Sequence, residues 1–275
     1  MKAIMGNHGD INRVDYGMSL WSHVIRPSLE YAGEILTLST TDLENLEKMQ
    51  RAVGKYILKA CRHTANEAVL GDLGWTTIKS KLDTMKLKYY QRICKMNRSR
   101  WTKVVFEMID SLNEINGQSK STWIKSIDEI STEVNIEKQK FVNLTSREVR
   151  NVVEKYDETK WQENMTKKSS LTHYLKFKSK RKHCENYLLS LSDFRGAQLK
   201  FKARSYTLGL AYEKRKWSNS DGDSTCPCCH KVDETLQHFM LECESFAMQR
   251  KIMMEGIVDI LTNNDERNLK SSVRG

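Results

Sequence analysis

Proline and glycine, the residues that most often interrupt regular structure, are scarce in this sequence. The 275 residues include only two prolines, Pro27 and Pro227, and 13 glycines. Folds rich in β-strands need frequent turns, and turns draw heavily on these two residue types. Apolar residues make up 39% of the chain and six residues are Trp, which is enough to bury a core. The sequence therefore predicts a mostly α fold with a helical bundle as its body.

Apolar residues recur at helical spacing along the first part of the chain. We expect helices over residues 12–36, where Pro27 interrupts the pattern, and from the capping-box patterns Thr41-Asp-Leu-Glu44 and Thr64-Ala-Asn-Glu67. Two stripes with spacings of three and four are expected to face the core. They are Ile78, Leu82, Met85, Tyr89, Ile93 and Met96, and then Trp101, Val104, Val105, Met108 and Leu112. The polar segment 113–122 is a candidate linker.

Positive charge is concentrated in one part of the chain. Segment 171–217 holds twelve Lys and Arg residues against three acidic ones, so it carries nine of the ten net positive charges. Such residues neutralise phosphates, and interleaved aromatic rings can stack on unpaired bases. The alternative is an ordinary basic surface with several of the rings in the core. We expect eleven of the cations to contact nucleic acid: Lys176, Lys178, Lys180, Arg181, Lys182, Lys200, Lys202, Arg204, Lys214, Arg215 and Lys216.

A cluster of cysteines near the end of the chain has the spacing of a metal site. Cys226, Cys229, His238 and Cys243 form the pattern Cys-x2-Cys-x8-His-x4-Cys. Two thiolates two residues apart can hold one ion from a tight turn, and a third thiolate with an imidazole completes a tetrahedron. The pattern predicts one Zn²⁺ in a small C-terminal CCHC zinc knuckle. A site closed by four protein ligands leaves no position for water, so the expected role is structural.

The spacing of the last two ligands restricts the local structure. On a regular α-helix, residues five apart point about 140° away from each other. We therefore expect a short helix that carries His238 and ends at Cys243, followed by a new helix over residues 245–261. Cys228 and His230 lie beside the proposed ligands, and either could replace one of them. A metal-free cluster of buried thiols is the other alternative.

Several absent features narrow the function. No signal peptide and no membrane-spanning apolar run are visible, and Cys61, Cys94 and Cys184 are isolated, so we expect an intracellular protein, nuclear or cytoplasmic, without a membrane partner. The sequence has no Asp-Asp pair for a polymerase palm, no phosphate-binding Gly-rich loop and no His-Glu-x-x-His. We expect the protein not to be an enzyme.

Short motifs spread along the chain share their order with a known family. They are Leu20-Trp21, Ile25-Arg-Pro-Ser-Leu-Glu-Tyr31, Leu46-Glu-Lys-Met-Gln50, Ile57-Leu58, Leu73-Gly-Trp75, Trp161-Gln162, Ser170-Leu-Thr-His-Tyr174, Asn186-Tyr-Leu188, Lys202-Ala-Arg204, Arg215-Lys-Trp217 and Glu234-Thr235 with the knuckle. This series resembles the C-terminal portion of the reverse transcriptase polyprotein of LINE-type (non-LTR) retrotransposons, downstream of the polymerase palm. The resemblance covers roughly residues 20–250.

The resemblance implies a helical thumb-and-connector-like region (11–115), a helical basic region (116–217) and a zinc-binding module (218–262), with flexible tails at 1–10 and 263–275. It implies that Cys226, Cys229, His238 and Cys243 bind zinc and that the basic segment contacts RNA or single-stranded DNA. Because the palm is missing, the expected function is that of a non-catalytic fragment, whose partner could be the missing polymerase portion. A zinc-stapled helical module for protein interaction is the alternative.

Overall fold

The computed structural model describes residues 13–116, 121–189, 194–218 and 222–272. It divides the chain into two compact units, Met1–Ser205 and Tyr206–Gly275. Within the described residues, helices account for the regular structure, apart from one isolated antiparallel bridge between Thr225 and Asp233. The mostly α prediction is therefore confirmed. None of the helices in these ranges is long and apolar enough to cross a membrane.

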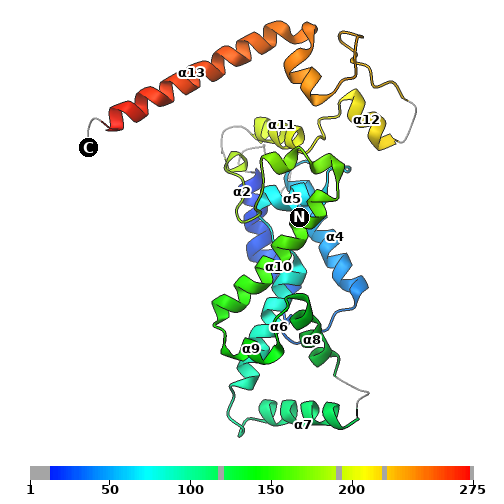
Figure 1. Ribbon diagram of the computed structural model, residues 1–275, viewed down its shortest axis with the longest axis vertical. Coiled ribbons are helices and arrows are strands. Elements are labelled where there is room, and N and C mark those ends of the chain that lie inside the picture. The colour runs from blue at the N-terminus through cyan, green and yellow to red at the C-terminus, as the bar shows by residue number, and fades with distance from the viewer. Residues whose placement is uncertain (1–12, 117–120, 190–193, 219–221, 273–275) are drawn as a thin grey trace. The chain divides into compact units, whose positions relative to one another are not determined.

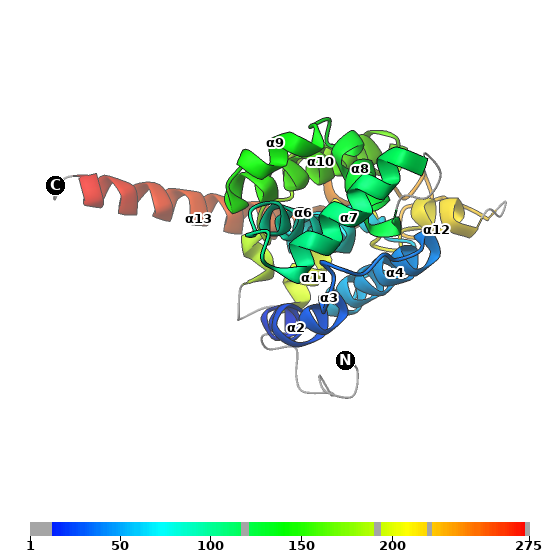
Figure 2. The same ribbon diagram turned by 90° about the horizontal axis from the view of Figure 1, so that it is seen from below.

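The first unit contains ten α-helices and four shorter helical turns among its described residues (Figure 1). In chain order they are α2 (Arg13–Leu20), the π-helix η1 (Trp21–Ile25), α3 (Arg26–Glu30), α4 (Thr40–Ile57), α5 (Asn66–Leu73), α6 (Ile78–Cys94), α7 (Trp101–Asn116), α8 (Thr122–Glu133), α9 (Lys138–Asn143), α10 (Ser146–Thr166), the 3₁₀ turns η2 (Ser169–Leu171), η3 (Tyr174–Lys176) and η4 (Asn186–Leu188), and α11 (Phe194–Arg204). Helix α6 is central, with α3 and α4 on one side and α8, α9 and α10 on the other (Figure 2).

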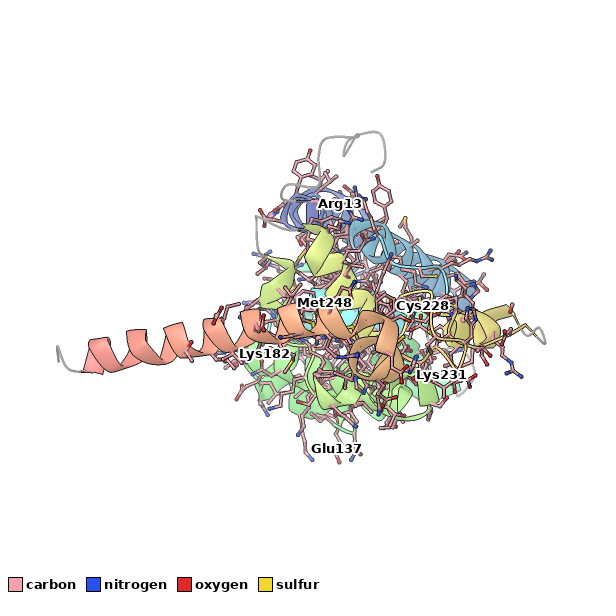
Figure 3. The ribbon with its side chains drawn as sticks, turned by 90° about the horizontal axis from the view of Figure 1, so that it is seen from above. Arg13, Glu137, Lys182, Cys228, Lys231 and Met248 are labelled. Carbon is pink, nitrogen blue, oxygen red and sulfur yellow. The ribbon has the colours of Figure 1, made fainter. Side chains whose placement is uncertain are left out.

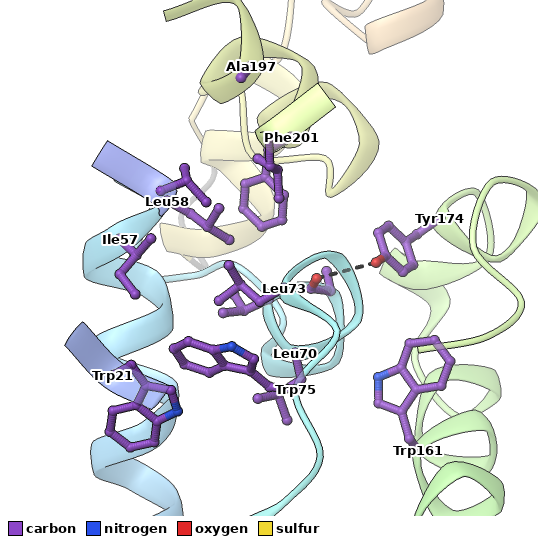
Figure 4. Close-up of a cluster of buried hydrophobic side chains, with 14 of the residues drawn as sticks. Trp21, Ile57, Leu58, Leu70, Leu73, Trp75, Trp161, Tyr174, Ala197 and Phe201 are labelled. Atoms are coloured by element: carbon purple, nitrogen blue, oxygen red, sulfur yellow. Dashed lines mark hydrogen bonds between the residues drawn. The ribbon is translucent and has the colours of Figure 1, made fainter. Parts of the chain in front are cut away.

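The main core of this unit joins segments that are far apart in the sequence (Figure 4). Trp21 stacks on Trp75 with ring centroids 5.1 Å apart, and Ile57 from α4 and Phe201 from α11 belong to the same buried cluster. Trp161 of α10 also belongs to it, and its indole N–H donates to the Glu67 carbonyl at 2.9 Å. The expected regions 11–115 and 116–217 therefore share one core, and the first unit ends at Ser205.

A second, smaller core lies between α6, α8, α9 and α10. It is built from Leu87, Tyr90, Ile127, Ile130, Phe141, Val149 and Val153. Gln91 of α6 is buried beside it and donates from its amide to the carbonyls of Phe141 and Leu144, which fixes the end of α9 to α6. The apolar stripe expected on α6 is thereby confirmed as a core face at Ile78, Leu82 and Ile93, all of which are buried.

Two predicted helix starts are shifted. Ser39 caps α4 and accepts a hydrogen bond from the Asp42 N–H at 3.1 Å, so the helix begins ahead of Thr41. Helix α5 begins after Ala65 rather than at Thr64, and Ala65 has no side chain with which to cap it. A capping box is found instead at Thr145, ahead of α10, where Glu148 completes it.

The prediction of a linker over residues 113–122 is wrong in part, because residues 113–116 belong to α7 and α8 begins at Thr122. Positions 117–120 lie outside the described residues, as does the predicted tail 1–10.

The prediction that the stripe on α7 faces the core is wrong for the four members whose side chains the structure describes; the side chain of the fifth, Leu112, lies outside that description. Trp101 is 82% exposed, and Val104, Val105 and Met108 are exposed as well. The helix packs through Phe106 instead, whose ring meets Tyr90 and Trp123 edge-on. An amphipathic pattern shows that a helix has an apolar face, but the rest of the unit must supply a surface to cover it.

The second unit contains α12 (Ala211–Ser218), the π-helix η5 (His238–Glu242), the 3₁₀ turn η6 (Glu244–Phe246) and α13 (Ala247–Ser272). Two buried carboxylates fix the start of α12. Glu213 accepts from the Gly209 N–H at 2.6 Å, and Glu234 accepts from the Ala211 N–H at 2.6 Å. Helix α13 continues past the predicted end at residue 261, so residues 263–272 of the expected tail 263–275 are helical, and residues 273–275 lie outside the described residues.

Candidate metal centre and basic surface

A miniature hairpin places the first two predicted metal ligands. The bridge between Thr225 and Asp233 brings its two arms together, and the Cys226 N–H donates to the Val232 carbonyl at 2.8 Å. The turn between the arms closes when the His230 N–H donates to the Cys226 carbonyl at 2.9 Å. His230 takes a positive φ of 54°, which reverses the chain directly after Cys229. Cys226 and Cys229 thus project from the same tight turn.

A π-helix places the other two ligands. His238 begins the π-helix η5 and Cys243 follows its last residue, with an extended backbone at φ −60° and ψ 120°. The Cys243 N–H donates to the His238 carbonyl at 2.8 Å, a bond across five residues instead of the four of an α-helix. The wider turn returns Cys243 to the side of the chain that carries His238. A new helix then starts at Ala247, close to the predicted 245.

The four side chains meet at one point. Their ligand atoms all lie within 4.8 Å of one another, with 3.9 Å between the sulfurs of Cys226 and Cys243 and 3.3 Å between the Cys229 sulfur and His238 Nε2. Ligands at the corners of a tetrahedron around zinc, with Zn–S bonds of about 2.3 Å, are spaced by roughly 3.8 Å. The structure therefore brings the four predicted residues together at distances that fit one metal ion.

The two alternative ligands lie outside this group. Cys228 is exposed on the hairpin turn (Figure 3), and the His230 side chain is exposed as well. In contrast, Cys226 and Cys243 are fully buried and His238 is 6% exposed. The geometry therefore favours the original set of four over either replacement.

The local environment favours a thiolate at Cys226. The backbone N–H of Cys229 faces its sulfur and, with the Cys228 N–H, outweighs the effect of burial and lowers the pKa of Cys226 to about 6. On the other side of the cluster, His238 directs Nε2 at Cys229 while its Nδ1 lies 3.9 Å from a Glu242 carboxylate oxygen. That separation is longer than a hydrogen bond, so Glu242 lies beside the imidazole without a hydrogen bond to it.

Three of the eleven cations predicted to contact nucleic acid are buried and paired with carboxylates. Lys178 binds Glu185 and also donates to the His183 carbonyl at 3.0 Å. Arg181, only 2% exposed, binds Asp157 of α10. Arg204 binds Glu185 at 2.7 Å and lies 3.2 Å from Asp72. The prediction is therefore corrected at these three positions. Their charges are paired with carboxylates inside the first unit and are not available to a phosphate.

The other eight cations retain access to solvent. Seven are exposed and Lys202 is half-buried. The exposed residues of the first unit are Lys176, Lys180, Lys182 and Lys200, and those of the second unit are Lys214, Arg215 and Lys216. Lys200 covers the Tyr187 ring at 4.9 Å and Lys216 covers the Tyr212 ring at 5.1 Å, so these two rings pack under cations.

The buried carboxylate beside Arg204 was not predicted from the sequence. Asp72 at the end of α5 is fully buried and accepts hydrogen bonds from Tyr174, at 2.6 Å, and from Tyr187. Burial raises the pKa of Asp72, while Arg204 and the two phenols act in the opposite direction. No neighbouring residue signals this contact, because Asp72 precedes Arg204 by 132 positions in the sequence.

No protein-family model, curated protein or solved structure matches this chain.

Proposed function

We propose that Cys226, Cys229, His238 and Cys243 bind one Zn²⁺ ion with a structural role. The convergence of these four ligand atoms carries the proposal. Three sulfurs and one imidazole form a donor set that suits zinc, and four protein ligands fill its coordination shell. The ion would hold the hairpin to the π-helix η5. Because Glu234 and Ser224 of the hairpin region bind α12, the ion would also support the helix that carries Lys214, Arg215 and Lys216.

Native mass spectrometry at neutral pH tests the metal proposal directly. We expect one zinc per chain in the unchanged protein and in Cys228→Ser, whose thiol lies outside the cluster. Cys229→Ser and His238→Ala are expected to lose zinc, because each removes one of the four ligands. Full zinc content in both of these variants would show that the assignment is wrong.

We further propose that the chain is a non-catalytic nucleic-acid-binding protein. Segment 171–217 carries nine of the ten net positive charges, and eight of its twelve cations are exposed. Lys and Arg at a surface bind phosphates by releasing counterions, so affinity falls steeply as salt rises. Binding of this kind needs no base recognition, and RNA and single-stranded DNA are the expected ligands.

Fluorescence anisotropy with a labelled single-stranded RNA and DNA between 50 and 200 mM salt tests this proposal. We expect binding that weakens with salt in the unchanged protein. The triple variant Lys176→Glu, Lys180→Glu, Lys182→Glu should bind more weakly than the matched control Lys48→Glu, Lys125→Glu, Lys140→Glu, which changes the net charge equally at exposed sites elsewhere in the first unit. Absence of binding, or an affinity that does not change with salt concentration, would contradict the proposal.

The resemblance to LINE-type reverse transcriptases supports this function and adds that the chain is a fragment of such a polyprotein. A Tyr-x-Asp-Asp coding segment in the genomic DNA directly upstream would support the proposal that the chain is a fragment. Absence of such a segment would count against that proposal. A primer-extension assay with Mg²⁺ is expected to give no product, because the sequence has no Asp-Asp pair to hold the metal ions.

A specific observation also favours a protein-interaction module as the second candidate. Helix α7 exposes Trp101, Val104, Val105 and Met108, and α13 exposes a run of apolar residues from Met248 to Leu261. Apolar side chains gathered on an exposed helix are typical of surfaces that bind other proteins. Chemical cross-linking with a candidate partner tests it: replacement of Trp101 and Met108 by Ser should abolish the cross-link, and the triple Lys176, Lys180, Lys182 variant should preserve it.

A further inference from the structure

One strip of the central helix remains open to solvent, and it is cationic. Most of α6 is covered by its neighbours, since ten of its 17 residues are buried. The uncovered side carries Lys81 and Arg92, which are exposed, and Lys88, which is half-buried; the exposed Lys95 follows at the C-cap. Successive spacings of seven, four and three residues place these side chains on one face of the helix. We call Lys81, Lys88, Arg92 and Lys95, together with Arg150 of α10, the α6 strip.

Helix α10 extends the strip sideways. Arg150 is exposed and lines, together with Lys81, a polar cavity of about 380 Å³ that residues of η1, α3, α6 and α10 surround. Burial, and then the positive charges of Arg150 and Lys81, lower the pKa of Lys88. The three cations therefore lie close enough to repel one another, although they come from two different helices.

Carboxylates compensate this strip poorly. Among the described residues, no acidic side chain forms an ion pair within 4.0 Å of any of its five cations. Glu154 is the one acid that acts on Lys88, and it lines the same cavity; Glu30, also in that cavity, is paired with Arg26. Neighbouring like charges repel one another and lower the stability of the folded chain. An anion bound from solution would offset this repulsion.

The dimensions of the strip fit a polyanion with closely spaced charges. Fourteen residues separate Lys81 from Lys95, which corresponds to about 21 Å along a helix. Along the axis of a duplex, each strand carries about six phosphates over that length, one every roughly 3.4 Å. The neighbouring ring, Tyr89, lies under the Arg92 guanidinium at 4.8 Å and packs edge-on against Trp123. The strip therefore offers charge but no ring free to stack on a base.

We propose that the α6 strip is a second nucleic-acid-binding surface, which follows a sugar-phosphate backbone by charge alone. The inference rests on the proposed nucleic-acid-binding function and extends it to a region that is nearly neutral in sequence. It is separate from the eleven cations expected from the sequence, because no residue of the strip belongs to segment 171–217.

The test compares two triple variants of the full zinc-loaded chain. The strip variant is Lys81→Gln, Arg92→Gln, Arg150→Gln, and the matched control is Lys48→Gln, Lys125→Gln, Lys140→Gln. Anisotropy with a labelled 20-nucleotide RNA and a 20-base-pair duplex is measured from 50 to 200 mM KCl. We expect the strip variant to bind roughly tenfold or more weakly at 100 mM and to lose about two to three units of the slope of log K against log salt. The control should follow the unchanged protein.

Other outcomes distinguish failure of this inference from failure of the proposed nucleic-acid-binding function on which it rests. If the strip variant binds like the unchanged protein while the Lys176, Lys180, Lys182 variant loses affinity, the strip has no role but the proposed function stands. If the unchanged protein binds neither nucleic acid, both fail. Equal losses in the strip variant and its control, or tighter binding to polyglutamate than to RNA, also overturn the inference. Should the strip variant not fold by circular dichroism, Arg92→Gln with Lys95→Gln, both exposed, is judged by the same criteria.

Discussion

Replacement of Arg204 by Met separates a structural role from a phosphate-binding one. The sequence places Arg204 among the cations that contact nucleic acid, yet its side chain is held between Asp72 and Glu185. Met keeps much of the aliphatic stem that packs in this site and removes the charge. The matched change is Lys202→Met, two residues earlier on α11, where the side chain is half-buried and no ion pair is found among the described residues.

The expected magnitude follows from what the Arg204 variant leaves behind. Asp72 is fully buried and would keep only the hydrogen bonds from Tyr174 and Tyr187. Removal of one partner from a buried ion pair typically costs about 3–5 kcal/mol in the free energy of unfolding. For a unit of this size, each kcal/mol lowers the melting temperature by about 2–4 °C, so we expect a decrease of roughly 6–20 °C.

Thermal unfolding followed by circular dichroism at 222 nm, with zinc present, measures this change. Lys202→Met should melt within about 2 °C of the unchanged protein and instead weaken binding to RNA. If Arg204→Met melts like the unchanged protein and reduces RNA affinity as Lys202→Met does, then Arg204 contacts phosphate and the structural role argued for it is refuted.

Three further changes test separate features. Lys178 and Arg204 outweigh the effect of burial and hold the pKa of Glu185 below its usual value; the stability this adds is present above the ordinary Glu pKa and is lost as pH falls below it. The difference in melting temperature between the unchanged protein and Glu185→Gln should therefore shrink on acidification, and a constant difference would contradict this. The positive φ of His230 costs a β-branched residue more than glycine, so His230→Val should bind zinc more weakly than His230→Gly in a chelator competition, and the reverse order would count against the hairpin geometry. Trp101 is 82% exposed, so Trp101→Ser should change the free energy of unfolding by no more than about 0.5 kcal/mol, and a loss of several kcal/mol in urea titration would show that α7 is covered.

The features predictable from the sequence are those set by neighbouring residues. The helical class followed from the scarcity of turn residues, and the metal ligands followed from a pattern within 18 residues, from Cys226 to Cys243. The exposed or buried state of the basic residues depends on distant partners. Arg204 is neutralised partly by Asp72, which precedes it by 132 positions, and Arg181 by Asp157, 24 positions earlier. Charge counted along a segment cannot show which cations the fold uses internally.

The prediction that the apolar stripe of α7 faces the core is wrong for a related reason. Its apolar stripe has the period of a core helix, and Phe106 on another side makes the actual contacts. Periodicity fixes which side chains share a face, but not which face meets the rest of the unit. The α6 strip shows the converse. Its cations are scattered among apolar residues in the sequence, and they share one surface because α3, α4, α8, α9 and α10 cover the remaining sides of the helix.

The spacing of His238 and Cys243 predicts that the regular α-helix is interrupted between them, but it does not predict the form of the interruption. Five residues on an α-helix point two ligands in different directions, so the pattern required an interruption between them. The expected solution was a helix that frays at Cys243. The structure keeps the chain helical and widens it, with a hydrogen bond from the Cys243 N–H to the His238 carbonyl. A π-helix is rare because its hydrogen bonds span a wider turn than the backbone prefers, and it occurs frequently, though not always, at functional sites. Here its five-residue bond matches the five-residue ligand spacing, so binding of one ion by both residues would stabilise the conformation that the backbone alone disfavours.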